Sequence, residues 1–258
     1  MKKINVHAGH AAVGGGAIGA VGLISESVED RIVKDKVIQL LRAEGYEVYD
    51  CTVDKGTQNG VLNAIVKKCN SHDDVDLDIS IHFNSGAKRP AKDGKTTGTE
   101  VYIYSVTGGA NVKAQNIVNA IANLGFKNRG VKVSKNLKVL RDTKAPALLI
   151  ECCFVDDGDD VGLYNAEAMA CAIVSGITGK TVKCEPKQEP AKSQKTGDFV
   201  VKLKCNMNVR KGPGTNYSIR QVAKKNYKFT ITEVKGGWGK LKSGAGWINI
   251  STQYVDYV

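Results

Sequence analysis

The first 180 residues alternate between two hydrophobic periodicities. Stretches with every second residue apolar, such as 77–83, predict strands, and stretches with apolar residues three or four apart, such as 28–44, predict amphipathic helices. The predicted strands are 3–7, 47–51, 77–83, 99–104 and 147–153, and the predicted helices are 28–44, 57–70, 110–124 and 160–178. Glu100 alternates with apolar neighbours and is expected on an exposed face. The pattern predicts an α/β domain with a central, mostly parallel, twisted sheet flanked by helices.

The pattern changes after residue 180. Residues 181–197 are polar, contain two prolines and have almost no apolar side chains, which predicts a linker. Residues 198–258 contain short apolar stretches separated by glycine-rich turns, with strands expected at 199–204, 227–234, 237–242 and 245–250. We therefore expect two domains, an α/β domain at 1–180 and a small all-β domain at 198–258.

The positive charge belongs to the second domain. The chain has a net charge of +11, yet residues 1–180 hold 22 basic against 21 acidic residues, and residues 181–258 hold 15 against 5. A basic domain of this kind implies a polyanionic partner, such as nucleic acid, an anionic membrane or a charged cell-wall polymer. The domain carries no nucleic-acid-binding signature, so nucleic acid is not the expected partner.

Three further features concern the cellular compartment. No apolar stretch approaches the roughly 20 residues that a membrane-spanning helix needs, so no membrane insertion is expected. The N-terminus is basic, but Asn5, His7 and His10 interrupt any apolar core, so no secretory signal is visible. The seven cysteines are an odd number without a C-x-x-C pair, which favours reduced thiols over a disulfide framework. These features predict synthesis in the cytoplasm.

Four side chains stand where α/β domains place their chemistry. His10 follows the first predicted strand, and His82 lies at the end of 77–83. Glu151 interrupts the most apolar strand, where a carboxylate must be paired, bound to metal or protonated. Glu26 begins a helix. Zinc hydrolases commonly use two histidines and a glutamate as ligands, and a further carboxylate can act as general base, so these residue types point to metal-assisted hydrolysis.

The residues alone leave alternatives open. Glu26 also suits a favourable charge at a helix N-terminus, and Glu29 or Asp30 could replace it as a ligand. His7 shares a short segment with His10 and is a rival ligand. Sequence spacing does not show that these segments meet in space.

Several short motifs occur in one order along the chain. They are Gly9-His10, Leu23-Ile24-Ser25-Glu26, Ser80-Ile81-His82-Phe83-Asn84, Asn128-Arg129-Gly130-Val131, Val139-Leu140-Arg141, and the run from Pro146 to Phe154. In this order and spacing they resemble the zinc-dependent N-acetylmuramoyl-L-alanine amidases of the Amidase_3 family, the type found in phage endolysins and bacterial autolysins. The resemblance covers roughly residues 3–178.

The resemblance implies a site and a reaction. It assigns His10, Glu26 and His82 as zinc ligands. It assigns Glu151 as the catalytic glutamate. Asn84 and Arg129 are candidate substrate contacts. The implied reaction is hydrolysis of the amide between N-acetylmuramic acid and the L-alanine of the peptidoglycan stem peptide. The chain departs from the family at His7, where many members have Asp, and at Ala11-Ala12, where many have Gly-Gly.

The tail resembles a bacterial SH3-type cell-wall-binding domain, which implies an SH3-like barrel. The resemblance rests on the segment from Asn206 to Tyr217, which reads NMNVRKGPGTNY, and on the glycine-flanked Trp238 and Trp247. Tyr217 and Trp238 are candidate contacts with peptidoglycan, and Trp247 is expected in the barrel core.

The sequence therefore predicts a modular peptidoglycan hydrolase. As a phage endolysin it would be made in the host cytoplasm and act on the wall after membrane permeabilisation; a bacterial autolysin is the alternative role. Two other functions remain open. One is a zinc endopeptidase of the stem peptide, and the other is a non-enzymatic binder of a polyanion or of the cell wall.

Overall fold

The computed structural model describes residues 2–182, 198–214, 217–235, 237–250 and 254–258. The chain divides into two compact units, Met1–Pro186 and Lys187–Val258. Nearly all of the predicted linker, 181–197, lies outside the described residues. Among the helices that the structure describes, none is both long and apolar enough to cross a membrane.

The first unit is built on a six-stranded sheet with the strand order β2-β1-β3-β6-β4-β5. Its strands are β1 (Lys3–Ala8), β2 (Glu47–Asp50), β3 (Leu77–Asn84), β4 (Thr99–Ile103), β5 (Asn128–Val133) and β6 (Ala147–Phe154). Every pairing is parallel except that of β4 with β6. Its helices are α1 (Glu26–Ala43), α2 (Gln58–Asn70), α3 (Ala110–Ala122), α4 (Lys138–Asp142), α5 (Gly158–Leu163) and α6 (Ala166–Thr178). The predicted α/β fold is confirmed.

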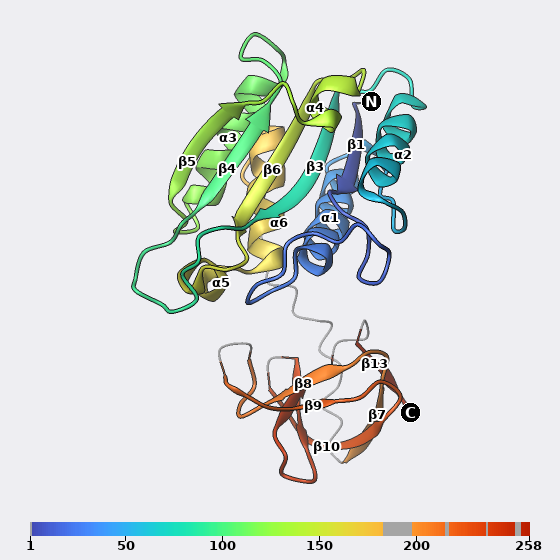
Figure 1. Ribbon diagram of the computed structural model, residues 1–258, viewed down its shortest axis with the longest axis vertical. Coiled ribbons are helices and arrows are strands. Elements are labelled where there is room, and N and C mark those ends of the chain that lie inside the picture. The colour runs from blue at the N-terminus through green and yellow to red at the C-terminus, as the bar shows by residue number, and fades with distance from the viewer. Residues whose placement is uncertain (1, 183–197, 215–216, 236, 251–253) are drawn as a thin grey trace. The chain divides into compact units, whose positions relative to one another are not determined.

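The two faces of this sheet are covered unequally. Helices α1, α3 and α6 pack on one face, where the largest apolar core lies (Figure 1). On the other face α2 and α4 enclose a smaller core that includes Ala147 and Leu149 of β6. No described helix covers β4 and β5 on this second face (Figure 1). Polar side chains on these two strands can therefore reach the surface beside the strand ends.

The structure of this unit differs from the predicted elements in three places. The predicted helix 160–178 is divided into α5 and α6, because the side chain of Asn165 accepts a hydrogen bond from the Ala168 N–H and starts a new helix. Strand β5 and the short helix α4 were not predicted. β5 lacks an apolar alternation and contains Gly130, whose φ of 82° lies in the left-handed region.

The second unit is a seven-stranded antiparallel sheet with the strand order β13-β7-β10-β11-β12-β8-β9. Its strands are β7 (Phe199–Leu203), β8 (Met207–Arg210), β9 (Ile219–Ala223), β10 (Lys228–Lys235), β11 (Trp238–Leu241), β12 (Trp247–Asn249) and β13 (Val255–Tyr257). This confirms the predicted all-β fold, and Trp247 is buried as expected. β8, β9 and β13 were not predicted. Most of β9 is exposed, so it lacks the apolar face that marks a strand.

The cysteines differ from the prediction at one position. Cys171 is disulfide-bonded, so the expectation of reduced thiols is wrong there. Among the described residues, Cys51, Cys69, Cys152, Cys153 and Cys205 have free thiols.

Candidate metal centre and active site

Two neighbouring parallel strands bring two histidines together. β1 and β3 pair in register, and the Gly9 N–H donates to the Ile81 carbonyl oxygen at 2.9 Å just beyond the end of β1. Parallel strands end at the same edge of a sheet, so His10 after β1 meets His82 near the end of β3. The two imidazole centroids are 4.9 Å apart and the rings are nearly perpendicular.

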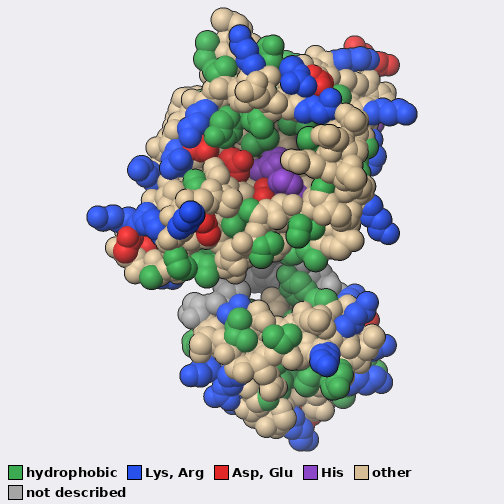
Figure 2. All heavy atoms as spheres, viewed as in Figure 1, with side chains coloured by type: hydrophobic (Ala, Val, Ile, Leu, Met, Phe, Trp, Pro, Cys, Tyr) green, Lys and Arg blue, Asp and Glu red, His purple; other side chains and the backbone are tan. Residues whose placement is uncertain are grey.

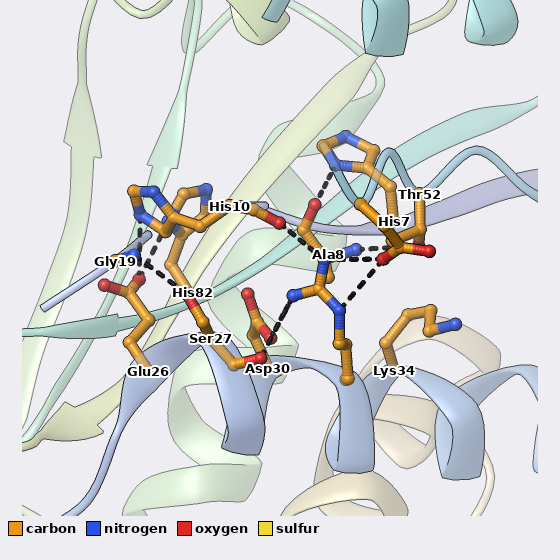
Figure 3. Close-up of polar contacts among 12 residues, drawn as sticks. His7, Ala8, His10, Gly19, Glu26, Ser27, Asp30, Lys34, Thr52 and His82 are labelled. Atoms are coloured by element: carbon orange, nitrogen blue, oxygen red, sulfur yellow. Dashed lines mark hydrogen bonds and ion pairs between the residues drawn. The ribbon is translucent and has the colours of Figure 1, made fainter. Parts of the chain in front are cut away.

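Glu26, the first residue of α1, lies beside both histidines. Its Oε1 lies 3.2 Å from His10 Nε2 and 3.1 Å from His82 Nδ1 (Figure 3). Backbone N–H groups hold the carboxylate, from Phe83 to Oε1 at 2.9 Å and from Ala20 to Oε2 at 2.7 Å. One ligand atom from each of the three side chains lies within 4.8 Å of the others. We call these three residues the ligand group.

The ligand group fits because two neighbouring residues, Gly9 and Gly19, have no side chain. A Cβ atom at Gly9 would lie 2.0 Å from the nearest atom of the His82 ring. A Cβ atom at Gly19 would lie 2.4 Å from Glu26 Oε2 and 2.8 Å from His10 Cδ2. Any side chain at either position would displace a ligand, so the glycine-rich segment that follows β1 is a steric requirement of the site.

The donor set fits a zinc ion. Two imidazole nitrogens and one carboxylate oxygen are the three protein ligands of a catalytic zinc site. Burial alone would raise the pKa of Glu26, but its contacts with His10 and His82 outweigh burial and hold the pKa below its usual range. Burial lowers the pKa of His82, which favours the neutral imidazole that binds metal. Burial lowers the pKa of His10, but its hydrogen bond with Glu26 raises the pKa more, so a bound metal would have to displace a proton there. The ligand group therefore has the geometry that a metal requires.

The rival ligands lie elsewhere. His7 is buried inside the sheet, where its Nδ1–H donates to the Ala8 carbonyl oxygen at 3.1 Å and burial lowers its pKa to about 4. Glu29 accepts a hydrogen bond from the Tyr164 hydroxyl at 3.0 Å. Asp30 is buried, and its Oδ1 lies 3.1 Å from Arg31 Nη1. None of these three belongs to the ligand group.

Glu151 lies next to the ligand group without being part of it. It stands on β6 in register with His82 on β3. Its Oε2 atom is buried and has no hydrogen-bond partner among the described residues. Burial raises the pKa of Glu151 to about 8, and the negative charges of Glu26 and Glu100 act in the same direction. A carboxyl group with such a pKa can both accept and return a proton near neutral pH.

Glu100 corrects the sequence-based expectation. It was expected on an exposed face, but it is 2% exposed and lies directly opposite Glu151 in the β4–β6 pairing. Strand alternation identifies which residues share a face, but it does not tell a solvent face from one that lines a site. Its carboxylate accepts from Asn84 Nδ2, the Tyr102 hydroxyl, Arg129 Nε and Lys132 Nζ. Thus Asn84 and Arg129, expected to contact substrate, both bind Glu100, and the roles of Tyr102 and Lys132 were missed.

Comparison with known proteins agrees with this site. The model of the Amidase_3 family, described as N-acetylmuramoyl-L-alanine amidase, matches residues 4–179, which is more than half of the chain. This chain belongs to that family. A bacterial SH3 domain model matches residues 206–256. We therefore call Met1–Pro186 the amidase unit and Lys187–Val258 the SH3 unit.

Relatives in sequence and structure come from several bacteria and phages. An uncharacterized protein of Clostridium perfringens is 32% identical over 223 residues, which is 83% of this chain and 64% of that protein. The endolysin of Bacillus phage SPP1 is 29% identical over 68% of this chain and 63% of its own length. The catalytic domain of the CD27L endolysin targeting Clostridia Difficile superposes with a TM-score of 0.63 at 28% identity, covering 71% of this chain and all of that one.

The chain spans about half to two-thirds of the length of the first curated relatives that it matches. A second solved structure, the catalytic domain of CwlV from Bacillus (Paenibacillus) polymyxa, has a TM-score of 0.57 at 26% identity and covers 69% of this chain and 97% of that one. Both solved catalytic domains thus match along almost their whole length within the amidase unit.

The ligand group of the amidase unit opens onto a groove. A cavity of about 610 Å³ extends from His10 and His82 toward the first turn of α2 and toward α4. Polar residues on its walls include Asn59 and Arg141. Figure 2 shows the histidine side chains at the surface of this face, with acidic side chains beside them. The groove leaves room for an extended substrate next to the ligand group.

The SH3 unit presents the two predicted wall contacts differently. Tyr217 is 42% exposed, and its ring packs over Gly212, where a Cβ atom would lie 2.4 Å from the ring. Arg210 Nη1 donates to the Tyr217 carbonyl oxygen at 2.9 Å, which fixes this turn. Trp238 is partly buried at the start of β11. Both side chains are accessible, and their contact with peptidoglycan stays a prediction.

Proposed function

We propose that this protein is a zinc-dependent peptidoglycan hydrolase that cleaves the amide between N-acetylmuramic acid and the L-alanine of the stem peptide. The observation that carries the proposal is the convergence of His10, Glu26 and His82, with Glu151 beside them, whose buried Oε2 has no hydrogen-bond partner among the described residues. The ligand group would hold zinc, and a bound zinc ion supplies a Lewis acid for the scissile carbonyl.

Glu151 moves the proton in this proposal. Its Oε2 takes a proton from the attacking water and returns it to the nitrogen of the leaving amine. The amide C–N bond breaks, a C–O bond forms, and the products are the lactyl carboxylate of the sugar and the free amino group of L-alanine. The raised pKa of Glu151 supports both halves of this transfer, because the group is neither too weak a base nor too weak an acid.

The proposed role is that of an endolysin, made in the host cytoplasm and acting on the wall after membrane permeabilisation. The likeness to the endolysin of Bacillus phage SPP1 and to the catalytic domain of the CD27L endolysin supports this role. A bacterial autolysin is the second candidate role, because the sporulation-specific N-acetylmuramoyl-L-alanine amidase of Bacillus subtilis is 28% identical over 68% of this chain.

The bond that is cleaved can be identified chemically. Purified cell walls are digested with the full chain, and the amino groups that appear are labelled and identified. We expect new L-alanine amino groups, and we expect them to stop appearing when a chelator removes zinc. New amino groups on another stem residue would instead show an endopeptidase, and walls that release nothing would show a non-enzymatic binder.

We also propose a division of labour between residues 1–180 and 198–258, joined by the linker 181–197. The basic SH3 unit would hold the amidase unit at its polymeric substrate, which raises the effective concentration without new contacts at the active site. Residues 198–258 alone should sediment with susceptible walls and lyse nothing. Residues 1–180 alone should cleave soluble muropeptides but clear intact walls more slowly.

A salt series tests the binding half of this prediction. Electrostatic attraction should weaken at ionic strengths well above about 0.15 M, where the Debye length is about 8 Å, while pocket contacts through Tyr217 or Trp238 should persist. If residues 198–258 bind no wall at any salt concentration and residues 1–180 clear walls at the full rate, the targeting role is wrong.

A further inference from the structure

Polar side chains form one row across four adjacent strands of the amidase unit. His82 on β3 is in register with Glu151 on β6, and Glu151 is in register with Glu100 on β4. The pairing of β4 with β5 shifts at this point, so that Arg129 and Gly130 both lie opposite Glu100. The row therefore runs from the ligand group, past the proposed base, to a cationic end formed by Arg129 and Lys132, on the face of β4 and β5 that no described helix covers.

The two cations at this end of the row, Arg129 and Lys132, carry more positive charge than the Glu100 carboxylate alone balances. The buried Glu100 carboxylate accepts from both Arg129 Nε, at 2.6 Å, and Lys132 Nζ on the same oxygen, Oε2. Its other oxygen already accepts from Asn84 and Tyr102 at 2.9 Å each. Glu100, Arg129 and Lys132 together therefore carry a net charge of +1, and Lys132 also interacts electrostatically with the neighbouring Glu151.

The excess charge faces the surface. The side chains of Arg129 and Lys132 are 29% and 38% exposed, while the Glu100 side chain is 2% exposed. The Arg129 guanidinium lies over the Phe154 ring at 5.0 Å, and Lys132 Nζ lies 5.7 Å from the centre of the Tyr102 ring. Neither Nη atom of Arg129 has a hydrogen-bond partner among the described residues. An arginine held in this way presents a fixed pair of donors whose geometry matches a carboxylate.

We propose that Arg129 and Lys132 bind a carboxylate of the stem peptide, on the residue that follows L-alanine, and that Glu100 positions both cations. The site therefore selects stem peptides with a free carboxylate at that residue over those with a carboxamide. This inference rests on the proposed amidase activity, because it needs the scissile amide to lie beside His82 and Glu151.

The spacing agrees with this assignment. Neighbouring strands are about 4.8 Å apart, so the carboxylate of Glu100 and the cations on it lie about one strand from Glu151. The α-carboxylate carbon of the next residue is five bonds from the scissile nitrogen, so in an extended peptide it lies up to about 6 Å away, which is comparable to one strand spacing. A peptide leaving the ligand group along the polar row would bring that carboxylate to the cations.

Two substrates test the proposal directly. Both are N-acetylmuramic acid joined by an amide bond to the same tripeptide. They differ only at the second stem residue, which carries either a free α-carboxylate or a carboxamide. For the wild-type chain we expect kcat/KM to favour the carboxylate by roughly tenfold, mainly through KM, as one charge-assisted contact provides. Lys132→Met and Arg129→Gln should each bring this ratio toward one, mainly by raising KM for the carboxylate substrate.

A matched control removes the same charge elsewhere in the unit. Lys67 is exposed on α2, so Lys67→Met should leave the ratio at its wild-type value. The ratio compares two substrates on one protein preparation, so partial unfolding of a variant lowers both rates and cancels. Equal kcat/KM values for the two substrates in the wild type, or an equal loss on both in the variants, would overturn the inference. Cleavage of neither peptide by the wild type would overturn the proposed activity itself.

Discussion

Replacing Glu151 with glutamine should lower wall hydrolysis by about two to four decades, which is the usual contribution of a general acid–base group. Glutamine has nearly the same shape but cannot take a proton from water at neutral pH. Because Glu151 lies outside the ligand group, the variant should keep its fold and about one zinc per chain. Zinc content and lysis rate must be measured on the same preparation.

The same variant has a predicted effect on stability. Burial raises the pKa of Glu151 to about 8 in the folded chain, against about 4.5 when unfolded. The folded state thus binds more protons between these values, so this group's contribution to the free energy of unfolding falls as pH rises from about 4.5 to about 8. In the metal-free protein, Glu151→Gln should therefore gain stability relative to the wild type across this window.

Glu44→Gln is the matched control for both effects. Glu44 follows the last residue of α1 and pairs with the exposed Lys180 at 3.3 Å, so its substitution should change neither lysis nor stability appreciably. If zinc is lost from Glu151→Gln instead, then Glu151 is a metal ligand and another carboxylate is the base.

Replacing His82 with alanine should remove both zinc and activity. Only two of the three side chains proposed to hold the ion then remain, and Glu26 loses one of the two histidines beside its carboxylate. Elemental analysis should find about one zinc per chain in the wild type and far less in the variant. His72→Ala is the control, because His72 stacks on Tyr49 away from the ligand group. A His82→Ala protein with full zinc content and activity would disprove the assignment of the metal site.

The ligand group could be predicted only in part from the sequence. His10 and His82 were found because parallel strands end at one edge of a sheet, and the pattern marked both strands. The preference for Glu26 over Glu29 and Asp30 came from the family resemblance, since all three lie in the first turns of one helix. The structure separates them by direction: α1 turns Glu26 toward the histidines, Glu29 toward Tyr164 and Asp30 toward Arg31.

The cationic end of the polar row could not be predicted in the same way. Its strand β5 is short, polar and interrupted by Gly130, so it has no hydrophobic period. The antiparallel direction of β4 against β6 also leaves no mark in the pattern of apolar residues. Consequently the sequence placed Glu100 on an outer face, although strand pairing puts it next to Glu151.

The lack of space for a side chain at Gly9 and Gly19 limits where a new metal ligand can be introduced. The imidazole of His82 and the carboxylate of Glu26 fill the volume that new side chains at these two positions would need. A fourth protein ligand, introduced to change metal preference or to silence the enzyme, cannot be grafted there. It would have to come from the walls of the groove, which Asn59 lines together with His10 and His82.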